Sequence, residues 1–161
     1  MNELNFIAHN FDPVYDQDSK ILILGSFPSV ISRENQFYYG NPRNRFWKLL
    51  AEILEQTVPE TIEDKKEFLI RNRIAIYDAA KSCEIIGSSD SSMKSIEPSD
   101  LEPILKNSSI EKVFANGKKA HDIVKKHFDI DIVLLPSTSP ANARYNLEQL
   151  KDKWKLILDY I

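Results

Sequence analysis

Short apolar runs alternate with helical patterns along almost the whole chain, and this alternation constrains the fold more than any other feature. The expected strands are residues 20–24, 73–77, 111–115 and 132–135. After a loop of variable length, each run is followed by a segment in which apolar residues recur at helical spacing, as in 46–54. Alternating strands and helices build parallel sheets with helices on both faces. We therefore predict an α/β protein, a three-layer α/β/α domain with a short, mainly parallel four-stranded sheet.

The segments between these elements carry few regular patterns. Residues 1–19 are predicted to be an irregular N-terminal arm, and residues 26–44 a long loop. Residues 82–99 contain seven serines and are also expected to be a loop. The pairs Thr61 with Asp64 and Ser99 with Glu102 have the spacing of helix capping boxes.

Composition narrows the class of protein. A length of 161 residues fits one domain, 1–161. The single Cys83 excludes a disulfide framework and multi-cysteine metal sites, and we predict no metal and no other cofactor. No apolar run is long enough to span a membrane and the start lacks a signal-peptide pattern, which predicts a cytoplasmic protein without a membrane partner. The net charge of −3 argues against indiscriminate nucleic-acid binding but allows a local basic face.

The first polar motif, Gly25-Ser26-Phe27-Pro28, directly follows a predicted strand. It lacks the glycine spacing of a dinucleotide-binding loop and the lysine of a P-loop. Gly25 allows a ligand to approach the backbone closely. Phe27 is either a stacking face for a planar base or a buried ring at a strand-end turn.

The second motif surrounds Asn44, just before a predicted helix. Asn is a favoured N-cap, so a structural role is open. The functional interpretation is that its carboxamide orients a water, which suits glycosidic cleavage, where the leaving group departs early. Tyr38 and Tyr39 are either walls of a planar pocket or packing residues. Arg43 belongs to a basic cluster that is either solvated or bound to phosphate.

The third motif, 137–140, reads Ser-Thr-Ser-Pro and follows the last predicted strand. Its hydroxyls and backbone N–H groups can hold a phosphate or a departing anion, or can form an ordinary polar turn. Arg144 is a candidate phosphate contact. Asp78 ends another predicted strand, where it either accepts a hydrogen bond from a base or caps a turn. Neither His9 nor Cys83 is assigned a role beyond a structural or incidental one.

Together, these segments resemble the uracil-DNA glycosylase superfamily. The similarity is greatest to its hypoxanthine-DNA glycosylase branch, which is related to the mismatch-specific uracil-DNA glycosylases. The resemblance covers nearly the whole chain. It is strongest in residues 23–29, 38–47 and 137–143. It implies a uracil-DNA glycosylase-like fold that binds DNA containing a deaminated base, with no obligate protein partner.

The resemblance also implies residue roles. The mismatch-specific relatives carry a water-activating Asn where this chain has Phe27, whereas the hypoxanthine branch places its catalytic Asn at Asn44. Phe27 would then stack on the flipped base. Ser137 stands where related families stabilise the departing base with His or Asn. Ala141 and Asn142 stand where relatives carry a wedge that fills the vacated stack.

We therefore predict a monofunctional DNA glycosylase of base excision repair. It would hydrolyse the N-glycosidic bond of hypoxanthine, and also that of uracil or xanthine. The catalytic residues are expected to be Asn44 and Ser137. The expected base contacts are Gly25, Ser26, Phe27, Tyr38, Tyr39 and Asp78. The expected DNA contacts are Arg43, Thr138, Ser139, Ala141, Asn142 and Arg144. Two alternatives stay open: a non-catalytic module that binds damaged or single-stranded DNA, and a nucleotide-handling phosphohydrolase or transferase.

Overall fold

A four-stranded parallel sheet forms the centre of the fold in the computed structural model, which describes residues 3–161. Its strands lie in the order β3 (Ile74–Asp78), β2 (Ile21–Gly25), β6 (Lys112–Asn116) and β7 (Val133–Leu135). Neighbouring strands are parallel throughout. The prediction of a mainly parallel four-stranded sheet is confirmed, with strand ends within about a residue or two of those expected.

The central strand β2 shows why the sheet is buried on both sides. Ile21 and Ile23 point into one apolar core, and Leu22 and Leu24 point into a second. All four side chains are fully buried. A continuous apolar run is what a parallel strand covered on both faces requires.

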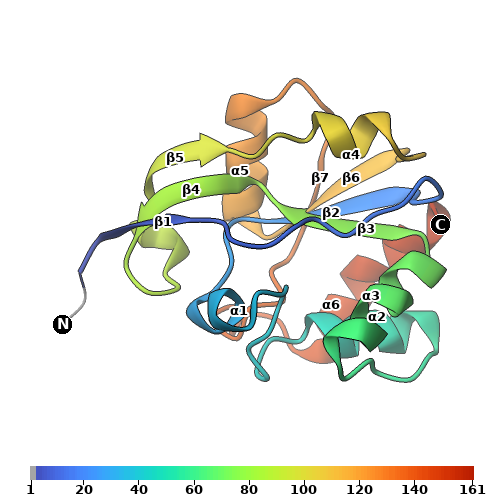
Figure 1. Cartoon of the computed structure of the whole chain (residues 1–161). Coiled ribbons are helices and arrows are strands. Elements are labelled where there is room, and N and C mark those ends of the chain that lie inside the picture. The colour runs from blue at the N-terminus through green and yellow to red at the C-terminus, as the bar shows by residue number, and fades with distance from the viewer. Residues whose placement is uncertain (1–2) are drawn as a thin grey trace.

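Helices cover both faces, which confirms the three-layer architecture. One face carries α2 (Phe46–Leu54), α3 (Ile62–Arg71) and α6 (Leu147–Trp154), followed by the 3₁₀ turn η2 (Lys155–Asp159). The opposite face carries α4 (Glu102–Lys106) and α5 (Lys118–His127). Figure 1 shows the two helix groups on opposite sides of the parallel strands. Within residues 3–161, no helix is long and apolar enough to cross a membrane.

A second, antiparallel sheet is the main feature that sequence patterns do not predict. Its strands lie in the order β1 (Asn5–Ala8), β4 (Ala80–Ile85) and β5 (Lys94–Pro98). The expectation of an irregular arm at 1–19 is therefore wrong for β1, and the expectation of a loop at 82–99 is wrong for most of β4 and for β5. β5 is largely exposed and polar, so its strand conformation comes from pairing with β4 rather than from an apolar pattern.

Two smaller expectations also change. The predicted loop 26–44 contains a short helix, α1 (Val30–Asn35), capped by Ser29 Oγ. Thr61 caps α3 as expected, accepting from the Asp64 N–H at 3.0 Å. The predicted cap at Ser99 is wrong, because α4 begins at Glu102 and the Ser99 hydroxyl donates to the Asp78 carbonyl at 2.7 Å.

The connections leave a crevice between β2 and β6. After β2 the chain crosses on the α2 and α3 face to reach β3, whereas after β6 it crosses on the α5 face to reach β7. The loops that leave two neighbouring strands therefore diverge. Open α/β sheets bind ligands in such a crevice at the carboxyl ends of the strands.

Candidate active site

A pocket with a volume of about 240 Å³ lies at this crevice. The carboxyl ends of β2, β3 and β6 contribute Gly25, Asp78 and Asn116 to its lining, and the loop after β7 contributes residues 137–141. Sites for drug-sized ligands typically measure about 300–1,000 Å³. The smaller pocket suits a single flat ring better than a whole dinucleotide.

The structure brings most of the predicted site residues into this one pocket. Those that line it are Gly25, Ser26, Phe27, Tyr38, Tyr39, Asn44, Asp78, Ser137, Thr138, Ser139 and Ala141. Three predicted DNA contacts lie outside it. Asn142 and Arg144 line a neighbouring groove, and Arg43 is exposed before α2 without lining either cavity.

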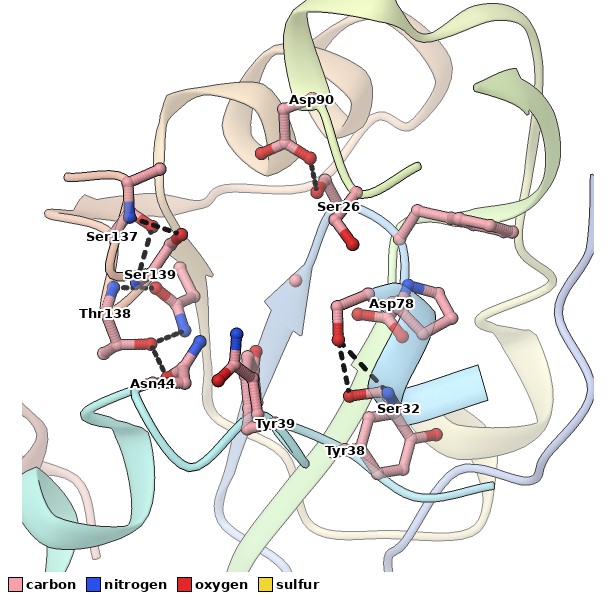
Figure 2. A pocket seen from close by; sticks show the side chains of 18 of the residues that line it. Ser26, Ser32, Tyr38, Tyr39, Asn44, Asp78, Asp90, Ser137, Thr138 and Ser139 are labelled. Carbon is pink, nitrogen blue, oxygen red and sulfur yellow. Dashed lines mark hydrogen bonds between the residues drawn. The ribbon is translucent and has the colours of Figure 1, made fainter. Parts of the chain in front are cut away.

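Asn44 is both a structural and a pocket residue. Its Oδ1 accepts from the Phe46 backbone N–H at 2.9 Å and from the Thr138 hydroxyl at 2.8 Å. The first bond satisfies a backbone N–H in the first turn of α2, so the carboxamide partly caps this helix. The side chain is only partly exposed and lines the pocket (Figure 2).

Asn116, at the end of β6, holds Thr138 from the other side. The Thr138 backbone N–H donates to Asn116 Oδ1 at 3.0 Å, and Asn116 Nδ2 donates to Thr138 Oγ1 at 3.0 Å. Thr138 is fully buried. The bonds connect Asn116, Thr138 and Asn44 into one network across three segments of the chain.

Arg45 fastens the loop after β7 to the start of α2. Its guanidinium donates to the carbonyls of Ser139 at 2.8 Å and Asn142 at 3.0 Å, and also to that of Tyr145. Its Nε reaches the Thr138 carbonyl at 3.3 Å. Arg45 therefore joins the second and third sequence motifs. Its guanidinium is bonded to backbone carbonyls and is not available as a free phosphate ligand.

Close packing also fixes the Ser137 end of this loop. A Cβ on Gly117, which has φ +99°, would lie 3.0 Å from Ser137 Cβ. Ser137 Oγ accepts from the Ser139 N–H at 3.1 Å. Among residues 3–161, no hydrogen bond donated by the Ser137 hydroxyl is found.

Asp78 is held by a histidine from the N-terminal arm. Its Oδ2 lies 2.8 Å from His9 Nε2, and both side chains are almost fully buried. A Cβ on Gly25 would lie only 2.5 Å from Asp78 Oδ1, which is closer than such atoms can approach. Gly25 is therefore needed because the carboxylate occupies the space of its missing side chain. His9 supports a predicted site residue, which the sequence patterns do not indicate.

The aromatic residues of the pocket play different parts. Tyr38 is buried and its hydroxyl donates to the Asp12 carbonyl at 2.7 Å, so only its ring faces the pocket. Tyr39 stacks on Phe46 with ring centroids 4.0 Å apart. Its hydroxyl is buried, and no hydrogen-bond partner for it lies within the described part of the chain. Burial raises the pKa of both phenols, so both keep their protons.

Phe27 combines the two roles that its sequence position allows. Its ring belongs to the core shared with α4 and α5, and it also lines the pocket. The Arg33 guanidinium carbon lies 5.7 Å from the ring centroid. The aromatic ring is thus fixed in place with part of its surface available to a ligand.

The β4–β5 connection adds a second carboxylate to the pocket. It contains the 3₁₀ turn η1 (Asp90–Ser92), and its Asp90 Oδ1 accepts from the Ser26 hydroxyl at 2.7 Å. Although Asp90 as a residue is exposed, its carboxylate turns inward toward Ser26 (Figure 2). Removal from water raises the pKa of this carboxyl, and the Ser26 hydrogen bond acts in the opposite direction.

A basic groove runs beside the pocket. It shares Asp90, Ser137, Ser139 and Ala141 with the pocket. The cationic residues that line it are Lys118, Lys119, Arg144 and Lys153. The overall negative charge of the chain therefore coexists with a local positive surface next to the candidate site.

The profile of the Uracil DNA glycosylase superfamily matches residues 13–160. The chain belongs to that superfamily. The match extends across both sheets except β1, and it includes every residue that lines the pocket.

Individual relatives agree with this membership. A hypoxanthine DNA glycosylase of Methanosarcina acetivorans is 32% identical over 94% of this chain and 98% of its own length. Another, from Methanosarcina barkeri, is 34% identical over 89% of this chain and 93% of its own. A solution NMR structure of a candidate uracil DNA glycosylase from M. acetivorans superposes with a TM-score of 0.76, at 31% identity over 91% of this chain and 93% of that one. These relatives support a DNA glycosylase function.

Four residues were not predicted as site residues from the sequence: Asn116 and Asp90, which line the pocket, and His9 and Arg45, which hold residues that line it. Asn116 could have been found, because it ends a strand as Asp78 does. Asp90 lies in a serine-rich segment, and His9 contacts a residue 69 positions away, so neither carries a local signal. Arg45 lies two residues from Arg43 in the same basic cluster, and the sequence does not show its carbonyl partners.

Proposed function

We propose that this protein is a monofunctional DNA glycosylase that removes deaminated bases, chiefly hypoxanthine, with uracil or xanthine as further substrates. Two relatives that share about a third of its residues over most of their length carry the name hypoxanthine DNA glycosylase. The substrate would be DNA in which the target nucleotide has left the stack. A cytoplasmic location stays a prediction.

The observation that carries the proposal is the position of Asn44. Its neutral carboxamide lines a small pocket with aromatic walls, at the strand ends where this fold class binds ligands. In the reaction the bond between the sugar C1′ and the base nitrogen breaks, and its electron pair stays with the base. Water adds to C1′ and loses a proton, and the departing base gains one, which leaves a free base and an abasic site. A carboxamide is too weak a base to take that proton, so we assign it a role in placing hydrogen bonds.

The other pocket residues are assigned by their contacts. Phe27, with its ring held in the core, is proposed to stack on the base. The Asp78 carboxylate, oriented by His9, would accept from an N–H on the base edge. The Ser137 hydroxyl, which donates no hydrogen bond within residues 3–161, is proposed to donate to the departing base.

The DNA strand is proposed to follow the basic groove. The groove shares part of the loop 137–141 with the pocket, so a flipped base in the pocket leaves its flanking phosphates near Arg144 and the lysines. Ala141 lines both cavities and Asn142 lines the groove, and we propose that the two residues face the gap left in the duplex.

The proposal is tested with labelled duplexes that contain a single inosine, uracil or xanthine. Purified protein should release the base, and subsequent alkali should cleave the strand at the abasic site. The reaction should proceed in the presence of EDTA and should need alkali for strand cleavage. Asn44→Ala should slow the single-turnover excision of hypoxanthine by about 10²- to 10³-fold, the usual effect of removing a preorganised hydrogen-bonding group.

Asn107→Ala is the matched control, because Asn107 is exposed at the end of α4 and does not line the pocket. It should excise at the wild-type rate. An Asn44→Ala variant that keeps near wild-type activity would contradict the assignment. Tight binding of an inosine duplex without any abasic product would favour the non-catalytic module instead.

The phosphohydrolase alternative predicts a different response. Asp78 and Asp90 share the pocket, but each has one oxygen bonded to a protein donor. Among residues 3–161, no group of three or more metal-ligating side chains comes together. Activity on nucleotides that appears only with added magnesium would nevertheless select this alternative.

A further inference from the structure

We infer that Asn116 and Thr138 are positioning residues that turn the Asn44 carboxamide so that its N–H group, not its oxygen, faces the base. This inference rests on the proposed glycosylase function and specifies how its central residue works. Asn44 would then donate a hydrogen bond to the departing base, in place of accepting one from the attacking water.

Two backbone N–H groups fix the orientation of both carboxamides. A backbone N–H can only donate, so the atom that it contacts must be an oxygen. The Phe46 N–H lies 2.9 Å from Asn44 Oδ1, and the Thr138 N–H lies 3.0 Å from Asn116 Oδ1. Exchanging the oxygen and nitrogen in either amide would place two donors against each other.

The Thr138 hydroxyl then has only one consistent orientation. Asn116 Nδ2 donates to Thr138 Oγ1 at 3.0 Å, so this oxygen acts as an acceptor toward Asn116. Its own proton is left for Asn44 Oδ1, 2.8 Å away. Thr138 is fully buried and Asn116 is 9% exposed, so solvent does not compete for these bonds. The donors therefore run in one direction, from Asn116 through Thr138 to Asn44.

The consequence for Asn44 concerns its two polar atoms. Its oxygen already accepts two hydrogen bonds, which fill the two lone-pair directions of a carbonyl. Its Nδ2 has no hydrogen-bond partner within residues 3–161. Figure 2 shows this nitrogen on the side away from Thr138, toward the interior of the pocket. The group that Asn44 offers to a ligand is therefore an N–H.

An N–H at this position suits the leaving group. Negative charge develops on the base as the glycosidic bond breaks, so a fixed donor binds the transition state more strongly than the ground state. Hypoxanthine carries a carbonyl oxygen and ring nitrogens that can accept. The chain of hydrogen bonds from Asn116 through Thr138 to Asn44, called the relay below, matters because it holds Asn44 in this orientation before the base arrives.

Asn44→Asp separates the two roles, because it replaces the N–H group with an acceptor of the same shape. If Asn44 donates, the Asp variant should be as slow as Asn44→Ala at neutral pH. Its single-turnover rate should rise as the pH falls, because a protonated carboxyl group can donate. If Asn44 accepts from water, the variant should keep activity within about tenfold of wild type at neutral pH and lose it as the pH falls. The second pattern would overturn the inference.

Thr138→Val tests the relay, because it keeps the shape of the side chain and removes the hydroxyl. We expect the single-turnover rate to fall about tenfold, as for the loss of one oriented hydrogen bond, with the Kd for an inosine duplex unchanged. Thr138→Ser keeps the hydroxyl and should restore the rate. Thr57→Val, on an exposed loop, is the matched control.

The outcomes also separate this inference from the proposed function. If the wild-type protein does not release hypoxanthine, uracil or xanthine, the proposed function fails. If it does, and Thr138→Val excises at the wild-type rate, only the relay fails. A Thr138→Ser variant as slow as Thr138→Val would also overturn the relay, because it would show that shape and not the hydroxyl is needed.

Discussion

The pocket has two polar walls that are built on different principles. The amide wall consists of Asn44, Thr138 and Asn116, whose donors and acceptors are fixed by backbone N–H groups. The carboxylate wall consists of Asp78 and Asp90, each held by one side-chain partner. Amides and hydroxyls do not titrate near neutral pH, whereas carboxylates respond to pH and to their donors. The comparison indicates that orientation controls the first wall, whereas the second depends on its supporting donors and, at Asp90, also on protonation.

Among the variants that test the carboxylate wall, the largest effect is expected at Gly25→Ala. The added Cβ would lie 2.5 Å from Asp78 Oδ1 and 3.0 Å from the Tyr39 hydroxyl. Asp78 cannot retreat without breaking its bond to His9. We expect the free energy of unfolding to fall by about 1–3 kcal/mol, as for other overpacked sites. Excision should fall by about 100-fold or more, because a carboxylate moved by about an ångström no longer meets the base.

Gly87→Ala serves as its control. A Cβ at Gly87 meets nothing within 4 Å, although φ there is +55°. This variant should lose only about 1 kcal/mol of stability to its left-handed backbone, with excision unchanged. Urea unfolding and single-turnover excision measure both variants. Wild-type excision by Gly25→Ala would show that the carboxylate wall does not contact the base.

The difference between the two walls also explains what could be predicted from the sequence. Gly25, Asn44, Asp78 and Thr138 lie at or just beyond the ends of regular elements, where periodic patterns stop and polar residues begin. Their convergence follows from the geometry of a parallel sheet. The buried strand β2 was predictable for the same reason, since its apolar run is continuous.

What could not be predicted depends on pairing between distant segments. Strand β1 exists because it pairs with β4, whose residues follow it by more than seventy positions. That pairing brings His9 to Asp78, and the β4–β5 connection brings Asp90 to Ser26. Local sequence patterns do not predict such contacts, because each partner taken alone is an ordinary polar residue. The support of Asp78 by His9 and the presence of Asp90 in the pocket were therefore missed.

An intermediate effect is expected when the support of Asp78 is removed by His9→Phe. The imidazole packs against aromatic rings, with Phe11 at 4.4 Å and Tyr77 at 5.1 Å between centroids, so a phenyl ring fits among them. The Asp78 carboxylate would lose its donor while buried, at a cost of about 1–3 kcal/mol in stability. Excision should fall by about tenfold as the carboxylate loses its orientation.

His9→Gln keeps a donor at a similar distance and should recover most of the rate. The pair of variants is compared by urea unfolding and by excision of hypoxanthine at saturating enzyme. If His9→Phe loses stability but excises as fast as wild type, His9 supports the fold and not the reaction. Such a result would leave the amide wall as the only oriented part of the site.

The smallest effect is expected from Asp90→Asn, which tests protonation on the carboxylate wall. Burial raises the pKa of Asp90 in the folded protein, so ionisation costs stability as the pH rises through the range between the unfolded and folded values. Asn cannot ionise and can still accept from Ser26. The variant should therefore be more stable than wild type at pH 7, and the difference should vanish below the ordinary aspartate pKa of about 3.9. Solvent screening of this exposed residue should keep the gain in Tm within about 2–4 °C.

Asp122→Asn is the matched control because its sign is opposite. The Lys118 ammonium donates to Asp122 at 2.8 Å and lowers the pKa of that exposed carboxyl. Its loss should slightly reduce Tm at pH 7, and the reduction should likewise vanish in acid, where both carboxyls are protonated. Thermal unfolding between pH 3 and pH 7 would compare the two variants. If both shift Tm in the same direction, the Asp90 carboxylate is not desolvated by the pocket, and the two walls differ in support alone.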